Sequence, residues 1–238
     1  MKALILNSGL GSRMGALTKE HPKCMTEIGG GETILSRQLR MIAGAGIREA
    51  VITTGYYDSV LMAYCRGLGL PIEYTFVKNE RYAETNYIYS IDCAREYLDD
   101  DILLMHGDLV FSRDVLEGML ASRNSRMAVS LSAPLPEKDF KAVVDGDLIR
   151  KVGIEFFDHA VAAQPLYRLR KEDWAQWLGK IEEFCENGTT GVYAENALNE
   201  LNGSAGIRAL DVGELLCSEI DNPEDLERVK RELAACGR

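Results

Sequence analysis

Residues 3–23, ALILNSGLGSRMGALTKEHPK, decide the fold of the N-terminal half. The stretch opens with a short apolar run, Ala3–Leu6, which is typical of a buried strand. The run ends at Asn7, and glycines follow it at positions 9, 11 and 15. Because glycine has no Cβ, successive backbone N–H groups of such a loop can point at an anion. The stretch therefore predicts a strand that enters an anion-binding loop.

The same rhythm of short apolar runs and helical segments continues to about residue 130. Further strands are predicted at 50–54, 72–77, 102–105 and 127–131. Apolar residues at helical spacing occur between them, at 33–43, 60–68, 86–97 and 116–120. Such alternation indicates βαβ units. We therefore predict an α/β fold with a Rossmann-like, mostly parallel sheet flanked by helices.

This fold predicts where a ligand binds, because ligands of parallel sheets lie beyond the carboxyl ends of the strands. The glycine loop at 9–15 follows the first strand, and Gly55-Tyr56 follows the second. Asp108 follows the strand at 102–105. We expect these segments to share one rim of the sheet. The acidic run Asp99–Asp101 precedes that strand, so we expect it at the opposite edge.

The second half of the chain has a different pattern. Lys141–Val144 and Leu148–Val152 flank Asp145-Gly146, which favours a type I′ turn and predicts a β-hairpin. A helix is predicted at 172–186, and strands at 207–210 and 215–220. Asn222-Pro223 then begins a terminal helix. Since neither a repeat nor a low-complexity linker divides the chain, we predict one domain over residues 1–238.

Composition and charge restrict the classes of function. Of the 238 residues, 46% are hydrophobic and 27% are charged, which excludes global disorder and coiled coil. Lys and Arg number 27 against 37 Asp and Glu, for a net charge of −10. Duplex nucleic acid needs a large basic surface, so we expect no nucleic-acid partner. A small anionic substrate is compatible with this charge, because nearby cations outweigh distant surface acids.

Cysteine usage and hydropathy give the expected compartment. The six cysteines show no CxxC spacing and no zinc-like Cys/His cluster, which is typical of reduced thiols. No stretch approaches the roughly 20 apolar residues of a membrane helix, and the N-terminal region has no long apolar signal segment. We therefore expect a cytoplasmic protein with no membrane partner.

Two cations strengthen the anion-binding interpretation of the first loop. The guanidinium of Arg13 can hold phosphate oxygens in a bidentate manner, and Lys23 after Pro22 adds a mobile positive charge. A dinucleotide fingerprint fails, because Met14 stands where a third glycine is needed and the second strand has no acid at its end. This disfavours an NAD(P) oxidoreductase. The P-loop pattern fails as well, since no GK[ST] follows.

The pattern GxGSRM…LT…PK after an N-terminal strand resembles the signature loop of nucleotidyltransferases that act on sugar phosphates and related phosphomonoesters. YAETNYIYS at 82–90, Asp108 at a strand end, and Glu219-Ile220-Asp221 further resemble the bacterial choline-phosphate cytidylyltransferases. The likeness covers residues 1–130 and 215–235. It implies a nucleotide-diphospho-sugar-transferase-like fold. The nucleotide-binding half is 1–130, and 131–238 form a small hairpin and helical acceptor-binding part with the C-terminal helix.

The resemblance also implies a reaction. An acceptor phosphate oxygen attacks the α-phosphorus of CTP, and pyrophosphate leaves. Arg13 and Lys23 would hold the triphosphate and stabilise the departing pyrophosphate, and together with Asp108 they form the expected catalytic set. Asp108 and Asp221 match the family's metal-binding aspartates, so the expected cofactor is Mg²⁺.

Each carboxylate has a structural alternative. Asp108 could instead cap a helix that starts near Ser112, and Asp221 could belong to the capping segment around Asn222. Asn86 is weighed equally as a ligand near the base and as the N-cap of its own helix.

The expected nucleotide-binding residues follow from the same resemblance: Leu6, Asn7, Ser8, Gly9, Gly11, Ser12, Arg13, Lys23, Gly55, Tyr56, Tyr82 and Asn86. The family commonly has two alanines where this chain has Asn7-Ser8. This departure leaves open which nucleoside triphosphate is preferred.

The expected acceptor is phosphocholine or a similar small phosphomonoester or phosphonate. A trimethylammonium group favours aromatic faces with carboxylates nearby, and the candidates are Phe157, Tyr193 and Glu195. One of Lys141, Arg150 and Lys151 is a candidate for contact with the acceptor phosphate. The expected partners are thus CTP or another nucleoside triphosphate and a small phosphorylated acceptor, and both a monomer and a homodimer are compatible with the sequence.

Two other functions are weighed against this one. A sugar-1-phosphate nucleotidyltransferase using UTP, dTTP or GTP usually needs a longer second half for its sugar pocket. A catalytically silent nucleotide sensor would not need paired metal carboxylates.

Overall fold

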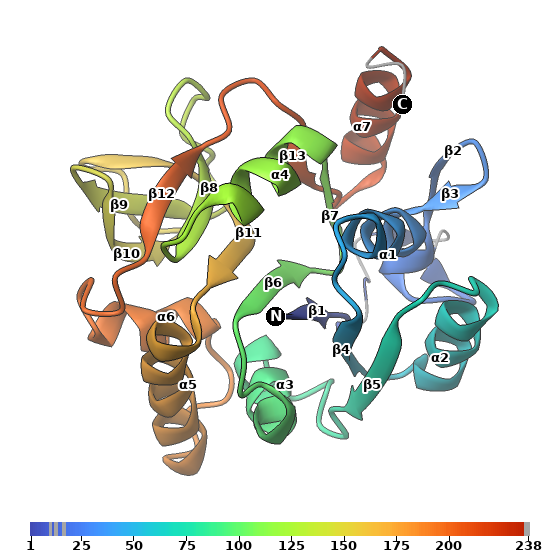
Figure 1. Cartoon of the computed structure of the whole chain (residues 1–238), viewed down its shortest axis with the longest axis horizontal. Coiled ribbons are helices and arrows are strands. Elements are labelled where there is room, and N and C mark those ends of the chain that lie inside the picture. The colour runs from blue at the N-terminus through green and yellow to red at the C-terminus, as the bar shows by residue number, and fades with distance from the viewer. Residues whose placement is uncertain (10, 12–13, 16–17, 236–238) are drawn as a thin grey trace.

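A parallel sheet forms the N-terminal half of the computed structural model, which describes residues 1–9, 11, 14–15 and 18–235 (Figure 1). Its strands lie side by side in the order β5 (Glu73–Lys78), β4 (Glu49–Thr54), β1 (Lys2–Leu6) and β6 (Ile102–His106). Leu6 pairs with Thr53 on one side and with His106 on the other. The carboxyl ends of these strands therefore lie together, as the sequence predicts.

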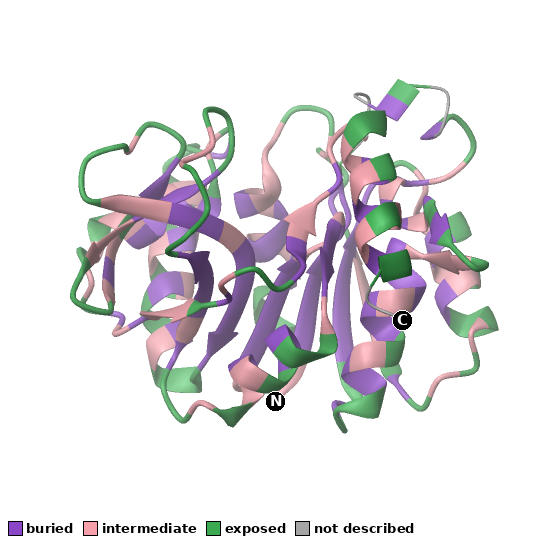
Figure 2. Ribbon diagram, turned by 90° about the horizontal axis from the view of Figure 1, so that it is seen from above, coloured by how far each residue is buried: buried purple, intermediate pink, exposed green. Residues whose placement is uncertain are grey.

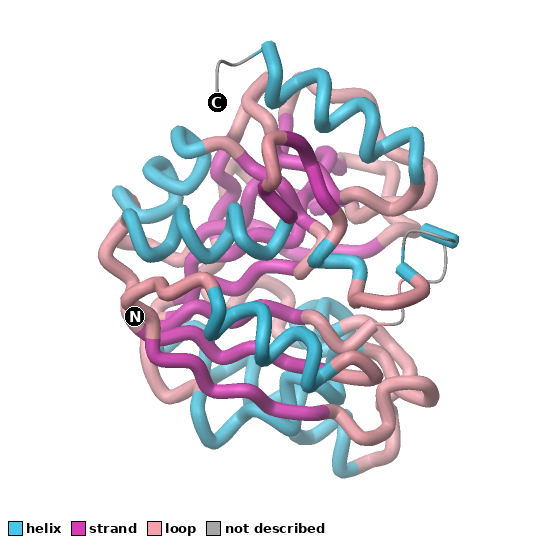
Figure 3. Tube along the Cα trace, turned by 90° about the vertical axis from the view of Figure 1, so that its right-hand side faces the viewer, coloured by secondary structure: helices cyan, strands magenta, loops and turns pink. Residues whose placement is uncertain are grey.

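Helices cover both faces of this sheet, and the side chains of β1 show why (Figures 2 and 3). Ala3 and Ile5 pack into one core, with α1 (Ile34–Gly44), α2 (Asp58–Gly67) and α4 (Arg113–Ala121). Leu4 and Leu6 pack into the other, with α3 (Tyr87–Ala94), α5 (Lys171–Glu186) and α6 (Ala194–Glu200). Because alternate residues enter opposite cores, the strand is apolar throughout and shows no alternation.

The second half continues the sheet but changes its direction. β11 (Ala160–Leu169) pairs antiparallel with both β6 and β8 (Arg126–Ser130). Beyond β8 follow β12 (Arg208–Asp211), β10 (Leu148–Gly153) and β9 (Lys141–Asp145). β9 also pairs with β11, so these five strands form a closed ring. The α/β fold is confirmed, whereas the sheet is mixed and is mostly parallel in its N-terminal half alone.

The sequence did not indicate β11, and Pro165 gives the reason. Proline has no backbone N–H to contribute to a sheet and usually argues against a strand. In β11 the pairing register shifts between Ala163 and Tyr167, around this proline. Before it the strand pairs with β9, and after it with β6. Pro165 therefore lies where the strand passes from one neighbour to the next.

The predicted hairpin is present as β9 and β10, but its turn differs from the expected one. Asp145 pairs with Leu148, which leaves Gly146 and Asp147 in the loop. Gly146 has a φ of 62°, whereas Asp147 is not among the residues with positive φ. A type I′ turn needs positive φ at both central residues, so the expectation of that turn was wrong.

The remaining elements are short, apart from the C-terminal helix. Leu226, Val229 and Leu233 form the buried stripe of that helix, α7 (Pro223–Ala235). Among the described residues, no helix has the length and apolar character needed to cross a bilayer. The short elements are η2 (Lys23–Met25), β2 (Glu27–Gly29), β3 (Glu32–Thr33), η3 (Arg95–Tyr97), β7 (Leu109–Phe111) and β13 (Cys217–Glu219).

Candidate active site

The three predicted segments meet at the carboxyl end of the parallel strands. A Cβ added to Gly55 would lie 2.4 Å from the carbonyl oxygen of Ser8, so β4 ends directly against the first loop. A Cβ added to Gly107 would lie 1.7 Å from Oδ1 of Asn7 and 2.8 Å from the carbonyl oxygen of Leu6. The shared rim is thus confirmed, and glycine is required at both approaches.

A cavity of about 250 Å³ opens between the first loop and the end of β6, and we call it the loop cavity. Both walls carry polar and charged groups, and Lys23 of η2 faces Asp108 across the space. Its described lining residues are Leu6, Asn7, Gly9, Gly11, Pro22, Lys23, Cys24, Gly107, Asp108 and Asp221. Seven of the predicted residues, including both metal-ligand candidates, therefore line one cavity.

Lys23 joins the two acids. Its Nζ donates to Oδ2 of Asp108 at 2.6 Å and to Oδ1 of Asp221 at 2.7 Å. The three side chains are mostly buried. The prediction that two sequence-distant acids lie close together is confirmed by this shared contact.

A two-stranded ladder brings the acids together. β7, which follows Asp108, pairs antiparallel with β13, which precedes Asp221. The N–H of Ile220 also donates to the carbonyl oxygen of Asp108 at 3.0 Å. Helix capping is done by other residues, since Ser112 caps α4 and Asn222 accepts from Asp225 at 2.9 Å. The capping alternative for Asp108 is therefore wrong, whereas Asp221 does adjoin the capping segment of α7, because its N–H donates to Oδ2 of Asp225 at 3.1 Å.

Charge pairing controls ionisation here. Burial opposes the charged form of Asp108, but the Lys23 ammonium and His106 hold the pKa of that carboxyl below its ordinary value. Burial likewise opposes the charge of Lys23, yet Asp108 and Asp221 raise the pKa of its ammonium. Both shifts favour the charged forms, so Asp108 is a carboxylate and Lys23 an ammonium at neutral pH.

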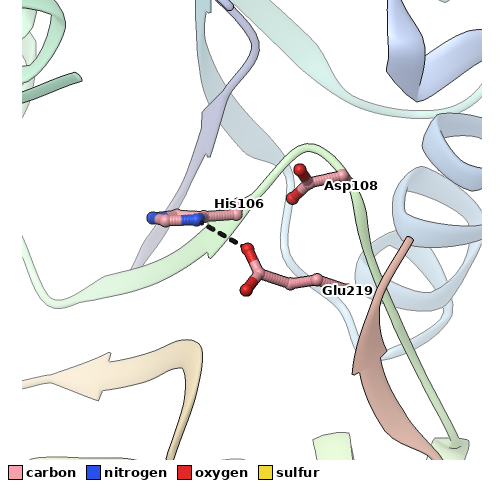
Figure 4. A group of neighbouring side chains, drawn as sticks. All are labelled: His106, Asp108 and Glu219. Carbon is pink, nitrogen blue, oxygen red and sulfur yellow. Dashed lines mark hydrogen bonds and ion pairs between the residues drawn. The ribbon is translucent and has the colours of Figure 1, made fainter. Parts of the chain in front are cut away.

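A second pair of titratable groups lies beside Asp108, and Figure 4 shows the three side chains pointing toward one another. His106 Nδ1 lies 3.0 Å from Oε1 of Glu219. Burial and the nearby Asp108 raise the pKa of Glu219 to about 7, although His106 opposes the shift. The ligand atoms of the three residues lie within 4.8 Å of one another. The sequence interpretation passed over His106, because a histidine at a strand end carries no signal without its partner.

A buried glutamine holds the turn that presents Asp108. Gln38 of α1 donates from Nε2 to the carbonyl oxygens of His106 at 2.9 Å and Leu109 at 2.8 Å. Both carbonyls belong to the turn between β6 and β7. Sequence reasoning missed this residue, since nothing in a helix indicates which loop its buried side chain will reach.

A smaller cavity of about 180 Å³ lies on the other side of β1, and we call it the inner cavity. Ser8, Tyr82 and Asn86 line it, together with Leu6 and Gly9. The side chain of Asn86 accepts from the N–H of Tyr87 at 2.8 Å, so it caps α3 while lining the cavity. Both alternatives for Asn86 are thus compatible with its position.

Tyr56 lies outside the lining of the inner cavity. Its ring is mostly exposed, and its centroid lies 6.2 Å from that of Tyr82. Gly55 contacts the loop through its backbone, as described above. Tyr56, which was predicted to bind the nucleotide, therefore lies on the rim of the site.

A third cavity, of about 370 Å³, lies beyond Asp108, and we call it the aromatic cavity. Tyr193 packs against Phe140 with centroids 5.1 Å apart and against Tyr87 at 5.8 Å. Tyr87 in turn packs edge-on against His106 at 4.7 Å. The described lining residues are Asn86, Tyr87, His106, Asp108, Lys138, Asp139, Phe140, Ile154, Tyr193, Glu219 and Asp221.

Two of the three predicted acceptor residues lie elsewhere. Glu195 is 1% exposed, and its carboxylate accepts from the hydroxyls of Tyr87 and Tyr167, so it supports the wall of the aromatic cavity from behind. Phe157 is exposed and its ring lies 4.3 Å from Nζ of Lys141. Glu195 and Phe157, predicted to bind the acceptor, are therefore not in the lining of the aromatic cavity, whereas Tyr193 is.

The three basic candidates for the acceptor phosphate have other contacts. Lys141 donates to the carbonyl oxygens of Pro136 at 2.6 Å and Asp139 at 3.0 Å. It therefore supports the loop that carries Lys138, which does line the aromatic cavity. Arg150 pairs with Asp145 on the hairpin, and Lys151 is exposed next to Phe156.

Two predicted ligands of the nucleotide, Ser12 and Arg13, and Leu17 of the motif lie outside the described residues.

The two aspartates suit a divalent cation. One oxygen of each already faces the same ammonium. Asp108 Oδ1 is buried and, within the described part of the chain, has no hydrogen-bond partner. Mg²⁺ is commonly held by one or two carboxylates together with phosphate oxygens and water. The donor set therefore supports the prediction of a magnesium site.

Replacing Gly107 with alanine tests the close approach at the rim. We expect a loss of about 1–3 kcal/mol of folding stability, because the new Cβ would overlap both the Asn7 side chain and the Leu6 backbone. Gly118→Ala is the matched control. Gly118 lies inside α4, and its new Cβ would make an ordinary contact with Leu210 at 3.5 Å. This substitution should stabilise the fold by about 0.5–1 kcal/mol. Equal unfolding midpoints for both variants would contradict the described geometry.

The fold and its rim place the chain in a known class of structures. The inositol-1-phosphate CTP transferase from T. maritima superposes with a TM-score of 0.80 and 22% identity, covering 98% of this chain and 94% of that one. This likeness shows the shared fold. The chain belongs to the family of the MobA-like NTP transferase domain, whose model matches residues 3–175. The sequence resemblance to nucleotidyltransferases is therefore confirmed.

Curated relatives agree with this family. The CMP-5'-(3-aminopropyl)phosphonate synthase of Streptomyces rubellomurinus is 31% identical over 239 residues, covering 94% of this chain and 37% of that protein. The choline-phosphate cytidylyltransferase of Haemophilus influenzae is 34% identical over 115 residues, covering 48% of this chain and 47% of that protein. The chain thus spans less than half the length of each.

Proposed function

We propose that the chain transfers CMP from CTP to a small phosphomonoester or phosphonate, with release of pyrophosphate. One observation carries the proposal: Asp108 and Asp221 line both the loop cavity and the aromatic cavity. The loop cavity has the backbone and the lysine that a triphosphate requires. The aromatic cavity is a separate space for an acceptor. Two substrates can therefore meet at the paired acids, an arrangement that a nucleotide sensor does not need.

The chemistry follows from this junction. An oxygen of the acceptor phosphate forms a bond to the α-phosphorus, and the bond between that phosphorus and the β-phosphate oxygen breaks. The electron pair leaves with pyrophosphate, whose negative charge Lys23 stabilises. Asp108 and Asp221 would hold Mg²⁺, which when bound neutralises charge on the phosphates. Holding two polyanions in line is then the main task of the protein.

The aromatic cavity supports an acceptor with a cationic headgroup. The ring of Tyr193 packs against those of Tyr87 and Phe140, and the same lining holds the carboxyl groups of Asp139 and Glu219 together with Lys138. Aromatic faces with nearby acids favour alkylammonium groups. The names of the Streptomyces and Haemophilus relatives specify an aminopropyl phosphonate and choline phosphate, both of which carry such a group. We propose phosphocholine or an aminoalkyl phosphonate as the acceptor.

A matrix of substrates tests this proposal. Pyrophosphate release would be measured for CTP, UTP, dTTP and GTP against phosphocholine, 3-aminopropylphosphonate and several sugar 1-phosphates. 3,3-Dimethylbutyl phosphate, the uncharged isostere of phosphocholine, is the matched control for the headgroup. We expect turnover with CTP, and a KM about tenfold lower for phosphocholine than for the isostere. Turnover restricted to UTP or dTTP with a sugar 1-phosphate would support the sugar nucleotidyltransferase instead.

Tyr193→Leu tests the aromatic wall separately from the chemistry. We expect the KM for a cationic acceptor to rise about tenfold, with little change for the uncharged isostere, because an aromatic face is lost. Tyr97→Leu, at a similarly exposed tyrosine of η3, is the control. If the two acceptors weaken equally, the tyrosine contributes contact area alone.

A further inference from the structure

The side-chain amide of Asn7 is buried in the loop cavity, and its nitrogen has no hydrogen-bond partner within the described part of the chain. Asn7 is 9% exposed, and among the described residues nothing accepts a hydrogen bond from its Nδ2. Buried polar side chains nearly always have a partner, so such a group indicates a ligand that completes it. Nδ2 carries two hydrogens and can act as a donor, so the partner must be an acceptor.

The backbone of Asn7 is held at the end of the neighbouring strand. The N–H of Asn7 donates to the carbonyl oxygen of Thr53 at 3.2 Å and lies 3.2 Å from Thr53 Oγ1, at the end of the neighbouring strand. Gly107 leaves the space that the amide occupies, since a Cβ there would lie 1.7 Å from Oδ1. The backbone that carries the side chain is therefore fixed by the strand, and the space for its amide exists without a ligand.

The cavities show which part of the substrates this donor faces. Asn7 lines the loop cavity together with Lys23, Asp108 and Asp221. The two acids also line the aromatic cavity, whereas Asn7 is not in its lining. The amide thus lies on the nucleotide side of the paired acids. On the proposed function, Lys23 and the paired acids hold the phosphates at this place, so the acceptor atoms nearest to Asn7 are phosphate oxygens.

Resting on the proposed function, we propose that Asn7 is a catalytic residue whose Nδ2–H donates to a non-bridging oxygen of the phosphoryl group under attack. Lys23 is engaged by two carboxylates, but an uncharged amide is not held by them in this way. It remains directed at the phosphoryl oxygen on which charge develops. A prepositioned donor of this kind stabilises the transition state more than the bound substrate.

Asn7→Ala tests the role through kinetics. We expect kcat to fall about 10²-fold, while the KM for the phosphorylated acceptor changes little. Asn7→Asp should lose more, because it replaces a donor with a third carboxylate. Tyr74→Phe is the matched control: it removes a buried hydroxyl on β5 that has no partner among the described residues and lies outside the three cavities, and it should leave the kinetics unchanged. An unchanged kcat for Asn7→Ala, or a change in acceptor KM alone, would overturn the proposal.

A stability measurement separates catalysis from a structural role. We expect the thermal unfolding midpoint of ligand-free Asn7→Ala to equal or exceed that of the wild type, because the change removes a donor without a partner. A midpoint that falls in step with activity would overturn the proposal. If the wild type turns over no substrate pair, the proposed function fails, and calorimetric titration with CTP and with cytidine decides about Asn7. Weaker CTP binding with unchanged cytidine binding would support it, and unchanged CTP binding would overturn it.

Discussion

Asp108→Asn is expected to lower the rate of pyrophosphate release about 10³-fold while the protein remains folded. Asp108 lines all three cavities around the junction, so in the proposed reaction both substrates would bring their phosphates to it. Asparagine has nearly the same shape as aspartate, so the substitution removes a negative charge from the proposed cation site and keeps the packing. The rate would be measured with CTP and the best acceptor from the substrate matrix, across a range of Mg²⁺ concentrations.

Asp99→Asn is the matched control for this prediction. Its side chain is 75% exposed and contacts Lys2 before β6 begins, at the edge of the sheet opposite the cavities. The same chemical change there should leave the rate unaltered. Near-normal pyrophosphate release by Asp108→Asn at ordinary Mg²⁺ would exclude it as a metal ligand.

Lys23→Met is expected to have the second largest effect, on both activity and stability. Pyrophosphate release should fall about 10²-fold, because the charge that stabilises the leaving group is lost. Folding stability at pH 7 should fall by about 2 kcal/mol, because two carboxylates lose their shared ammonium. This is less than for fully buried pairs, since the side chains of Asp108 and Asp221 are 22% and 20% exposed.

The pH dependence of this loss has a definite sign. In the wild type the pKa of Asp108 lies below its ordinary value of 3.8, so its contribution to stability is present above that pH and is lost as the pH falls through the folded pKa. Without Lys23, burial raises the pKa of this carboxyl. The variant's deficit should therefore be full at pH 7 and shrink toward pH 4, as Asp108 becomes protonated.

Denaturant unfolding at several pH values between 4 and 8 would measure this difference. Lys180→Met is the control, because Lys180 pairs with Glu183 on the surface of α5 and is not in the lining of any of the three cavities. Its stability should differ little from the wild type at every pH. A deficit of Lys23→Met that stays constant across the range would contradict the charge-pairing argument.

The sequence predicted those elements of the fold whose apolar pattern is local. β1, β4 and β6 are buried on both faces, so each appears as a short apolar run. β11 could not be recognised in this way, because Pro165 interrupts it and its pairing depends on two different neighbours. The mixed direction of the sheet follows from β11 and from β10, which pairs antiparallel with both β12 and β9.

The site was predictable where it depends on strand ends. Asp108 follows β6 directly, and the resemblance added Asp221, which the ladder of β7 and β13 brings beside it. Gln38 donates to a carbonyl group of a distant strand, and His106 contacts Glu219 of another strand. No local sequence pattern reveals such contacts. Glu195 was wrongly assigned because a carboxylate in an aromatic stretch gives no sign, in sequence, of facing two tyrosine hydroxyls behind the wall.

The closed ring of β11, β8, β12, β10 and β9 has a consequence for how this scaffold changes during evolution. Each of its strands is paired on both sides, so residues in the connecting loops can be exchanged without creating an open strand edge that invites aggregation. The loop that carries Lys138 and Asp139 is attached to this ring, whereas Lys23 is attached to the parallel half. If the proposed function holds, substitutions in the loops of the ring can alter the preferred acceptor while the parallel half keeps Lys23 in place.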